Sequence, residues 1–257
     1  MKRTLILSAL LLAVGFTATA DRRRLMLARS VAVAAGCTTA DTALAHDELL
    51  EGWTGAGQEN TWTSGGGEAG VTIDLDGDSS ALTTGKPAGA CDEAAKFTVV
   101  SASGTETYRY WDRGSAIATN ADLNVRLYVY VEAGPDTGET FQFFYGGAFT
   151  APGSGGGRAR LNFVNVSGQL KLSASGTVTT STSGTNGNIA SNTWNKVEIL
   201  LAGTDPTAST LVINDGTPLA FTSSLQLARY FAVGPGSSLE TGDSATFWLD
   251  VIAVETP

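Results

Sequence analysis

The sequence predicts an all-β fold in which two antiparallel sheets form a sandwich. Short segments alternate apolar and polar residues with a period of two, the pattern of strands with one buried face. Turn-forming residues separate these segments, and Gly alone occurs 31 times. Charged residues make up only 16% of the chain, too few for long helices with charged outer faces. With 257 residues and 42% hydrophobic content, such a sandwich can fold as a single domain around one core.

Each strand is predicted from its own alternation, and the clearest pattern is that of Asn124–Val131. The other predicted strands are residues 71–75, 96–100, 105–111, 140–145, 158–164, 169–172, 194–201, 210–214, 225–233 and 245–254. Asp76–Asp78 is predicted to be a turn, and residues 176–192, rich in Ser, Thr, Gly and Asn, an irregular connection. No repeat of fixed period is visible, which argues against a propeller or a β-helix.

The first 45 residues have the pattern of a secretory leader. Basic Met1–Arg3 precedes the apolar run Leu5–Phe16 and the small residues Ala18–Ala20, which form a cleavage site. The pattern then repeats with Arg22–Arg24 and a second apolar run that ends before Ala43–Ala45. Either the leader is longer than its first cleavage site suggests, or residues 21–45 are a retained arm. We therefore expect a leader at 1–45, a sandwich domain at 46–257, and a secreted or cell-surface protein.

The chain has two cysteines, Cys37 and Cys91. In an oxidising compartment they could form a disulfide that ties the arm to the domain. The alternative is that Cys37 leaves with the leader and Cys91 is a small buried residue.

The net charge of −9 excludes some classes of function. Residues 1–45 hold six basic and two acidic residues, so the remaining domain is more acidic than the whole chain. Such a domain repels phosphate backbones, and we expect no nucleic-acid partner. His46 is the only histidine, which excludes any mechanism that needs two.

Three segments resemble the concanavalin A-like jelly rolls of the laminin-G and glucanase type. Asn192–Ile199 is similar to their W-x-x-V-x-I strand, and Thr210–Gly216 to the following V-N-G hairpin with an added Asp. Phe247–Val254 is similar to their closing strand with its Asp. The resemblance covers residues 47–257 and implies a two-sheet jelly-roll sandwich. It says little about activity, because the fold hosts lectins, adhesion modules, hydrolases, lyases and virion proteins.

The resemblance also implies a sugar groove on the concave sheet, and strand parity suggests which residues line it. If Val125, Leu127, Val129 and Val131 face the core, their neighbours face outward. Parity likewise places Tyr145 inward. The outward or same-face residues predicted to bind a ligand are Arg109, Trp111, Arg126, Tyr128, Tyr130, Gln142, Phe144, Arg158, Arg160 and Asn162. If their strands are neighbours, one surface carries aromatic rings for stacking and Arg, Gln and Asn for hydroxyls or carboxylates. The alternative is an ordinary solvated surface.

Catalysis is not predicted by any motif. The Glu-x-Asp-x-x-Glu string of jelly-roll glycosidases is absent, and so are the Gln-x-His and Tyr-x-Lys elements of jelly-roll polysaccharide lyases. Tyr128 or Tyr130 acting alone as base and acid would need a depressed or well-placed phenol. Whether the protein is an enzyme stays open, and the sequence favours a non-catalytic protein.

No cofactor is required by these patterns, although a structural Ca²⁺ is one interpretation of two acidic features. Asp74, Asp76 and Asp78 offer oxygen ligands near a turn, and Asp250 is where related jelly rolls keep a calcium ligand, by resemblance. Ordinary turn formation by Asp and Gly is the alternative.

Three hypotheses of function follow. The first is an exported, non-catalytic jelly roll that binds a polysaccharide or other glycan, with the arginines suggesting an acidic one, or that acts in adhesion. The second is a structural subunit of an extracellular filament or virion surface, self-assembling through the N-terminal arm as an added strand. The third is an enzyme of the polysaccharide lyase type.

Overall fold

The structure is a computed structural model, and its described residues lie in one compact unit, Gly36–Pro257. It describes residues 63–67, 70–86, 93–101, 103–105, 107–117, 121–147, 157–175, 185–223, 228–236 and 240–255. The predicted leader, the arm at 21–45, His46, Cys37 and Cys91 lie outside these residues. The leader, the domain boundary and the disulfide therefore stay predictions.

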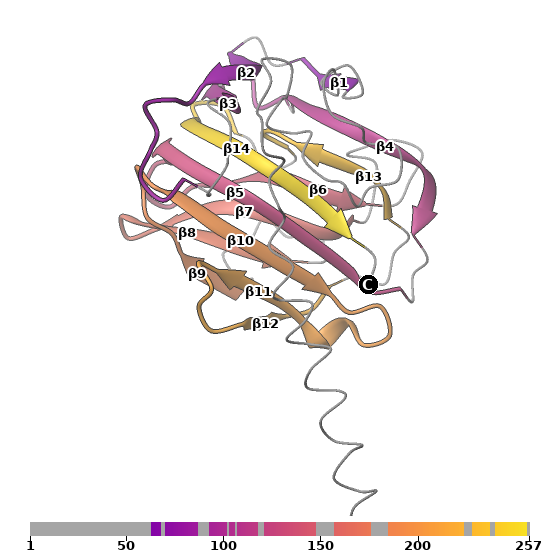
Figure 1. Ribbon diagram of the computed structural model, residues 1–257. Helices are drawn as coiled ribbons and strands as arrows, with labels where there is room; N and C mark the ends of the chain where they lie inside the picture. Colours follow the sequence, from indigo (N-terminus) through magenta and orange to yellow (C-terminus); the bar gives the residue numbers. More distant parts are fainter. Residues whose placement is uncertain are drawn as a thin grey trace, which may run out of the picture. The chain divides into compact units, whose positions relative to one another are not determined.

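The described strands form two seven-stranded sheets in which all neighbours are antiparallel (Figure 1). Sheet A has, in spatial order, β1 (Thr63–Gly66), β4 (Thr107–Ile117), β13 (Ala228–Val233), β6 (Thr140–Gly147), β7 (Gly157–Val166), β8 (Gln169–Ser175) and β9 (Thr185–Asn188). Sheet B has β12 (Leu219–Phe221), β11 (Ser209–Ile213), β10 (Trp194–Leu201), β5 (Leu123–Ala133), β14 (Ser244–Glu255), β3 (Glu93–Val100) and β2 (Val71–Asp78). The predicted jelly-roll sandwich is confirmed.

The one helix among the described residues is a single 3₁₀ turn, η2 (Pro206–Ala208), capped by Asp205. Its Oδ1 accepts a hydrogen bond from the backbone N–H of Thr207. Within the described stretches, no helix has the length and apolar character needed to cross a membrane.

The sequence analysis missed three short strands and misplaced one turn. β1, β9 and β12 have little apolar alternation, and β9 (Thr185–Asn188) falls in the stretch predicted to be irregular. Backbone pairing with β8 holds β9 in the sheet, which composition does not reveal. The predicted turn at Asp76–Asp78 is wrong, because β2 continues to Asp78 with a register irregularity between Asp74 and Gly77.

The core between the sheets is held by four phenylalanines, two from each sheet. Phe97 and Phe247 of sheet B stack with ring centroids 4.7 Å apart, and Phe143 and Phe163 of sheet A stack at 4.1 Å. Phe247 meets Phe163 edge-on at 5.0 Å and Phe143 at 6.0 Å. All four side chains are fully buried, so their contacts fix how the two sheets pack.

We expect Phe247→Ala to lower the free energy of unfolding by about 3–5 kcal/mol, because it leaves a cavity between the sheets. Val100→Ala is the matched control, since the Val100 side chain is 61% exposed and should cost less than about 0.5 kcal/mol. Urea unfolding measures both variants. Equal losses in the two would contradict this description of the core.

Candidate functional site

The strand order divides the predicted ligand-binding residues between two separate surfaces. Arg126, Tyr128 and Tyr130 lie on β5 in sheet B, whereas Gln142 and residues 158–162 lie on β6 and β7 in sheet A. Core residues alternate with Arg126, Tyr128 and Tyr130 on β5 and flank Asn162 on β7, and Gln142 is the register partner of Asn162, so the two groups point away from the core on opposite sheets. The hypothesis that one surface carries all of them is therefore wrong.

On the outer face of sheet B, Tyr130 belongs to a second buried cluster. Its ring lies 5.5 Å from that of Trp194, and Trp248 and Ala94 complete the cluster. The indole N–H of Trp194 donates to the backbone carbonyl of Leu82 at 2.7 Å. This hydrogen bond holds the connection after β2 against the outer face of sheet B. Tyr130 is only 7% exposed, so its role here is packing.

Arg126 on the same face is held by an ion-pair network. Its Nε lies 3.0 Å from Glu198 Oε1, and Lys196 Nζ lies 3.2 Å from Glu198 Oε2 and 2.7 Å from Asp215 Oδ1. Burial lowers the pKa of Lys196, but its hydrogen bonds to Asp215 and Glu198 raise it overall. The guanidinium of Arg126 thus has a carboxylate partner within the protein itself.

Tyr128 lies beside this network and is not prepared to act as a base. Desolvation by burial raises the pKa of its phenol, and the nearby cations Lys196 and Arg126 offset this only in part. A general base at neutral pH needs the opposite shift, because a neutral phenol cannot accept the proton. The structure thus argues against Tyr128 as a lone catalytic base.

In sheet A, a bulge in β6 reverses the predicted orientation of two residues. The register with β7 pairs Gln142 with Asn162 and Phe144 with Leu161, so Phe143 is the extra residue. Phe143 and Phe144 therefore both face the core, and the prediction that Phe144 faces outward is wrong. Beyond the bulge Tyr145 pairs with Arg160 on the outer face, although parity predicted it inward.

Five side chains then lie together on the outer face of sheet A, and we call them the polar row: Gln142, Tyr145, Arg160, Asn162 and Ser173. Gln142, Asn162 and Ser173 are register partners across β6, β7 and β8, and paired residues share a face. Arg160 Nη1 donates to Gln142 Oε1 at 3.0 Å, and its guanidinium lies 5.2 Å from the Tyr145 ring centre. All five are at least nine-tenths buried.

Two acceptor atoms in the polar row have no hydrogen-bond partner among the residues that the structure describes. Asn162 Oδ1 and Ser173 Oγ are both buried and both unsatisfied. Buried polar atoms are nearly always satisfied in native proteins, so unsatisfied ones on a shared face indicate an absent partner such as water or a ligand.

Gly236 lies against Gln142 and leaves room for its amide. Its backbone N–H donates to the Gln142 carbonyl at 2.9 Å, and a Cβ at Gly236 would lie 2.6 Å from Gln142 Nε2. A larger residue at this position would push the amide from its place beside Arg160.

The remaining predicted ligand residues are placed by backbone register alone. Arg109 is the partner of Val233 and Trp111 of Phe231, and both partners belong to the core cluster. Arg158 lies within β7. Their side chains lie outside what the structure describes, so their part in a site stays a prediction.

The predicted calcium ligands occupy different strands. Asp74 on β2 pairs with Lys96 on β3. Asp250 lies on β14, two strands away from β2, where it pairs with Tyr128 on β5 and is 2% exposed. Hydrogen bonds from Ser80 lower the pKa of Asp78, and Ser80 N donates to its Oδ1 at 2.9 Å. In the described part of the chain, no three acidic, thiol or imidazole side chains lie close enough to hold a metal. Asp76 lies in β2 with its side chain not described, and the calcium site stays a prediction.

Two members of the polar row were missed in the sequence. For Tyr145, the signal in the sequence was the two consecutive phenylalanines Phe143 and Phe144, because two adjacent core residues interrupt the period-two alternation of a strand and indicate a bulge. Ser173 was missed because the strand was predicted to end at Leu172, although the alternation of Leu170, Leu172 and Ala174 continues past it.

Comparisons with known proteins support the fold. No protein-family model and no curated protein matches this chain by sequence. Among solved structures, the cellulose-induced protein Cip1 is similar with a TM-score of 0.54 at 14% identity, over 79% of this chain and 94% of Cip1. The carbohydrate esterase vb_24B_21 from Shiga toxin-encoding bacteriophage phi24B is similar with a TM-score of 0.51 at 18% identity, over 86% of this chain and 99% of that one. At these identities the likeness shows the fold alone.

We expect Tyr128→Phe to remove a phenol that ionises above the usual range of tyrosine, as followed by ultraviolet absorbance. The raised pKa also sets a sign for stability. As pH rises, Tyr128 ionises at a lower pH in the unfolded chain than in the folded protein. The wild type therefore loses the stability that comes from the neutral, buried phenol as pH rises above about 10. The variant should lose less stability than the wild type between about pH 8 and about pH 11, measured by urea unfolding. Identical pH dependence in both proteins would contradict the assigned shift.

Proposed function

We propose that this protein is an exported, non-catalytic jelly roll that binds a polysaccharide on the outer face of sheet A. The observation that carries the proposal is the pair of buried, unsatisfied acceptors, Asn162 Oδ1 and Ser173 Oγ, on one face of adjacent strands. Sugar hydroxyls are donors of the kind that these atoms lack, and Ser173 Oγ can donate as well.

The neighbouring side chains fit the same ligand class. Arg160 brings a guanidinium, whose position is set by Gln142 at 3.0 Å and by the ring of Tyr145 at 5.2 Å. A guanidinium forms two parallel hydrogen bonds with a carboxylate, which favours uronic acid units over neutral sugars. We therefore propose an acidic polysaccharide as the ligand.

One protein of similar fold is named a carbohydrate esterase, which is compatible with the carbohydrate ligand proposed here and has no bearing on the non-catalytic part. The argument nevertheless rests on the polar row of this chain, because fold does not determine function.

Burial of the polar row constrains how a ligand binds. Asn162 and Ser173 are 5% and 1% exposed, so the face must open before a sugar reaches them. Binding that requires a conformational change has a slower association rate than a rigid encounter, so we expect slow association.

The sharpest test is Ser173→Ala. Because Ser173 Oγ has no hydrogen-bond partner in the described part of the chain, its removal should leave the free energy of unfolding unchanged or slightly higher. Removal of a hydrogen bond to the ligand should weaken the binding of alginate oligosaccharides by about fivefold, measured by calorimetry.

The matched control is Ser79→Ala, which removes another buried hydroxyl for which the described residues offer no partner, on a connection outside the polar row. It should leave both stability and binding unchanged. Absence of alginate-oligosaccharide binding, or equal effects of the two substitutions on it, would refute the proposal. Release of unsaturated uronate products by the wild type would refute its non-catalytic part.

A further inference from the structure

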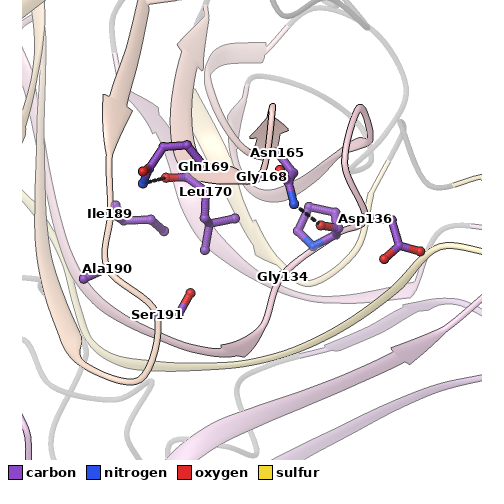
Figure 2. A pocket seen from close by; sticks show the side chains of 10 residues that line it. Gly134, Asp136, Asn165, Gly168, Gln169, Leu170, Ile189, Ala190 and Ser191 are labelled. Atoms are coloured by element: carbon purple, nitrogen blue, oxygen red, sulfur yellow. Dashed lines mark hydrogen bonds between the residues drawn. The ribbon is translucent and has the colours of Figure 1, made fainter.

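A pocket of about 390 Å³ lies where three connections between strands meet (Figure 2). They are the β5–β6 connection at residues 134–139, the β7–β8 turn at 167–168 and the β9–β10 connection at 189–193. Its volume falls within the range of about 300–1,000 Å³ that small-molecule sites occupy.

This pocket is distinct from the polar row. Asn165, which lines the pocket, pairs with Leu170, and Leu170 belongs to the core cluster. Asn162, by contrast, pairs with Ser173 on the outer face. Parity along β7 therefore puts the pocket and the polar row on opposite sides of sheet A.

Asn165 is held in one orientation at the pocket wall. Its Nδ2 donates to the carbonyl of Pro135 at 2.8 Å, as Figure 2 shows, and its backbone C=O accepts from Gly138 N at 2.8 Å. A carbonyl can only accept, so this contact fixes which end of the amide is nitrogen. The opposite atom, Oδ1, is buried and has no hydrogen-bond partner among the described residues, so a donor in the pocket would reach it only after a small shift of the Asn165 side chain.

The exposed lining of the pocket is mostly polar, and its two large apolar side chains are largely buried. Leu170 and Ile189 are 7% and 4% exposed, and Figure 2 draws both among the side chains that line the pocket. A Cβ at Gly134 would lie 2.9 Å from Leu170 Cδ1, so glycine lets Leu170 keep this place. The carboxylate of Asp136 and the hydroxyl of Ser191 lie at the exposed rim.

Charge narrows the ligand class. The described residues that line the pocket include Asp136 but no Lys or Arg, so an anionic ligand is disfavoured. A ligand that donates hydroxyl hydrogens to Asp136 and meets an otherwise uncharged, mostly polar lining has the chemistry of an uncharged sugar ring. We infer that this pocket is a second binding site, specific for a neutral sugar unit. This inference does not depend on the function proposed for the polar row.

The test titrates the full chain with neutral methyl glycosides of glucose, galactose, mannose and xylose, followed by nuclear magnetic resonance. We expect saturable binding of at least one of them with a Kd on the order of 1 mM, and weaker binding of glucuronate. Ala190→Trp fills the pocket from an exposed position and should weaken this binding at least about tenfold. Asp136→Asn should weaken it about fivefold, because the amide is a poorer acceptor.

Ala220→Trp is the matched control, since Ala220 is also exposed but lies on β12, away from the lining residues. It should leave glycoside binding unchanged, and so should Ser173→Ala in the polar row. The inference is overturned if no neutral glycoside binds, if Ala190→Trp binds like the wild type, or if only Ca²⁺ binds and Asp136→Asn abolishes it. Ala190→Trp should leave alginate-oligosaccharide binding intact, so failures of the two proposals can be told apart.

Discussion

The contact on which the rest of the structure depends is the packing of four phenylalanines between the sheets. Phe97 and Phe247 stack in sheet B, Phe143 and Phe163 stack in sheet A, and Phe247 joins the pairs by edge contacts. Rings of this size and geometry leave one way for the sheets to pack. Every outward-facing side chain is positioned by this core, because strand alternation fixes the outer face once the inner face is set.

The bulge in β6 is a local consequence of that core. Two adjacent residues, Phe143 and Phe144, both enter the core, and a regular strand cannot place neighbours on one face. The extra residue shifts the register, so Tyr145 pairs with Arg160 on the outer face. The polar row thus exists in its present form because the core requires both phenylalanines.

The two outer faces differ in what their polar groups do. On sheet B, Arg126 and Lys196 share the carboxylate of Glu198, and the indole of Trp194 is hydrogen-bonded to the connection after β2. On sheet A the polar row leaves Asn162 Oδ1 and Ser173 Oγ unsatisfied, and a third unsatisfied acceptor, Asn165 Oδ1, lies at the pocket. Self-satisfied groups stabilise a fold, whereas unsatisfied ones at a shared location point to binding.

The sequence by itself determined the all-β class, most strand positions and the inward residues of β5, because period-two alternation is local and strong there. It also identified Gln142, Arg160 and Asn162 as outward-facing residues. Only the tertiary structure decided that β5 and β6 lie in different sheets, since strand order depends on contacts distant in sequence. The same reason hid the bulge partner Tyr145 and the pocket at Asn165, which three separate connections assemble. Alternation along a regular strand is local to the sequence, but the bulge in β6 and the neighbours across a sheet are set by packing.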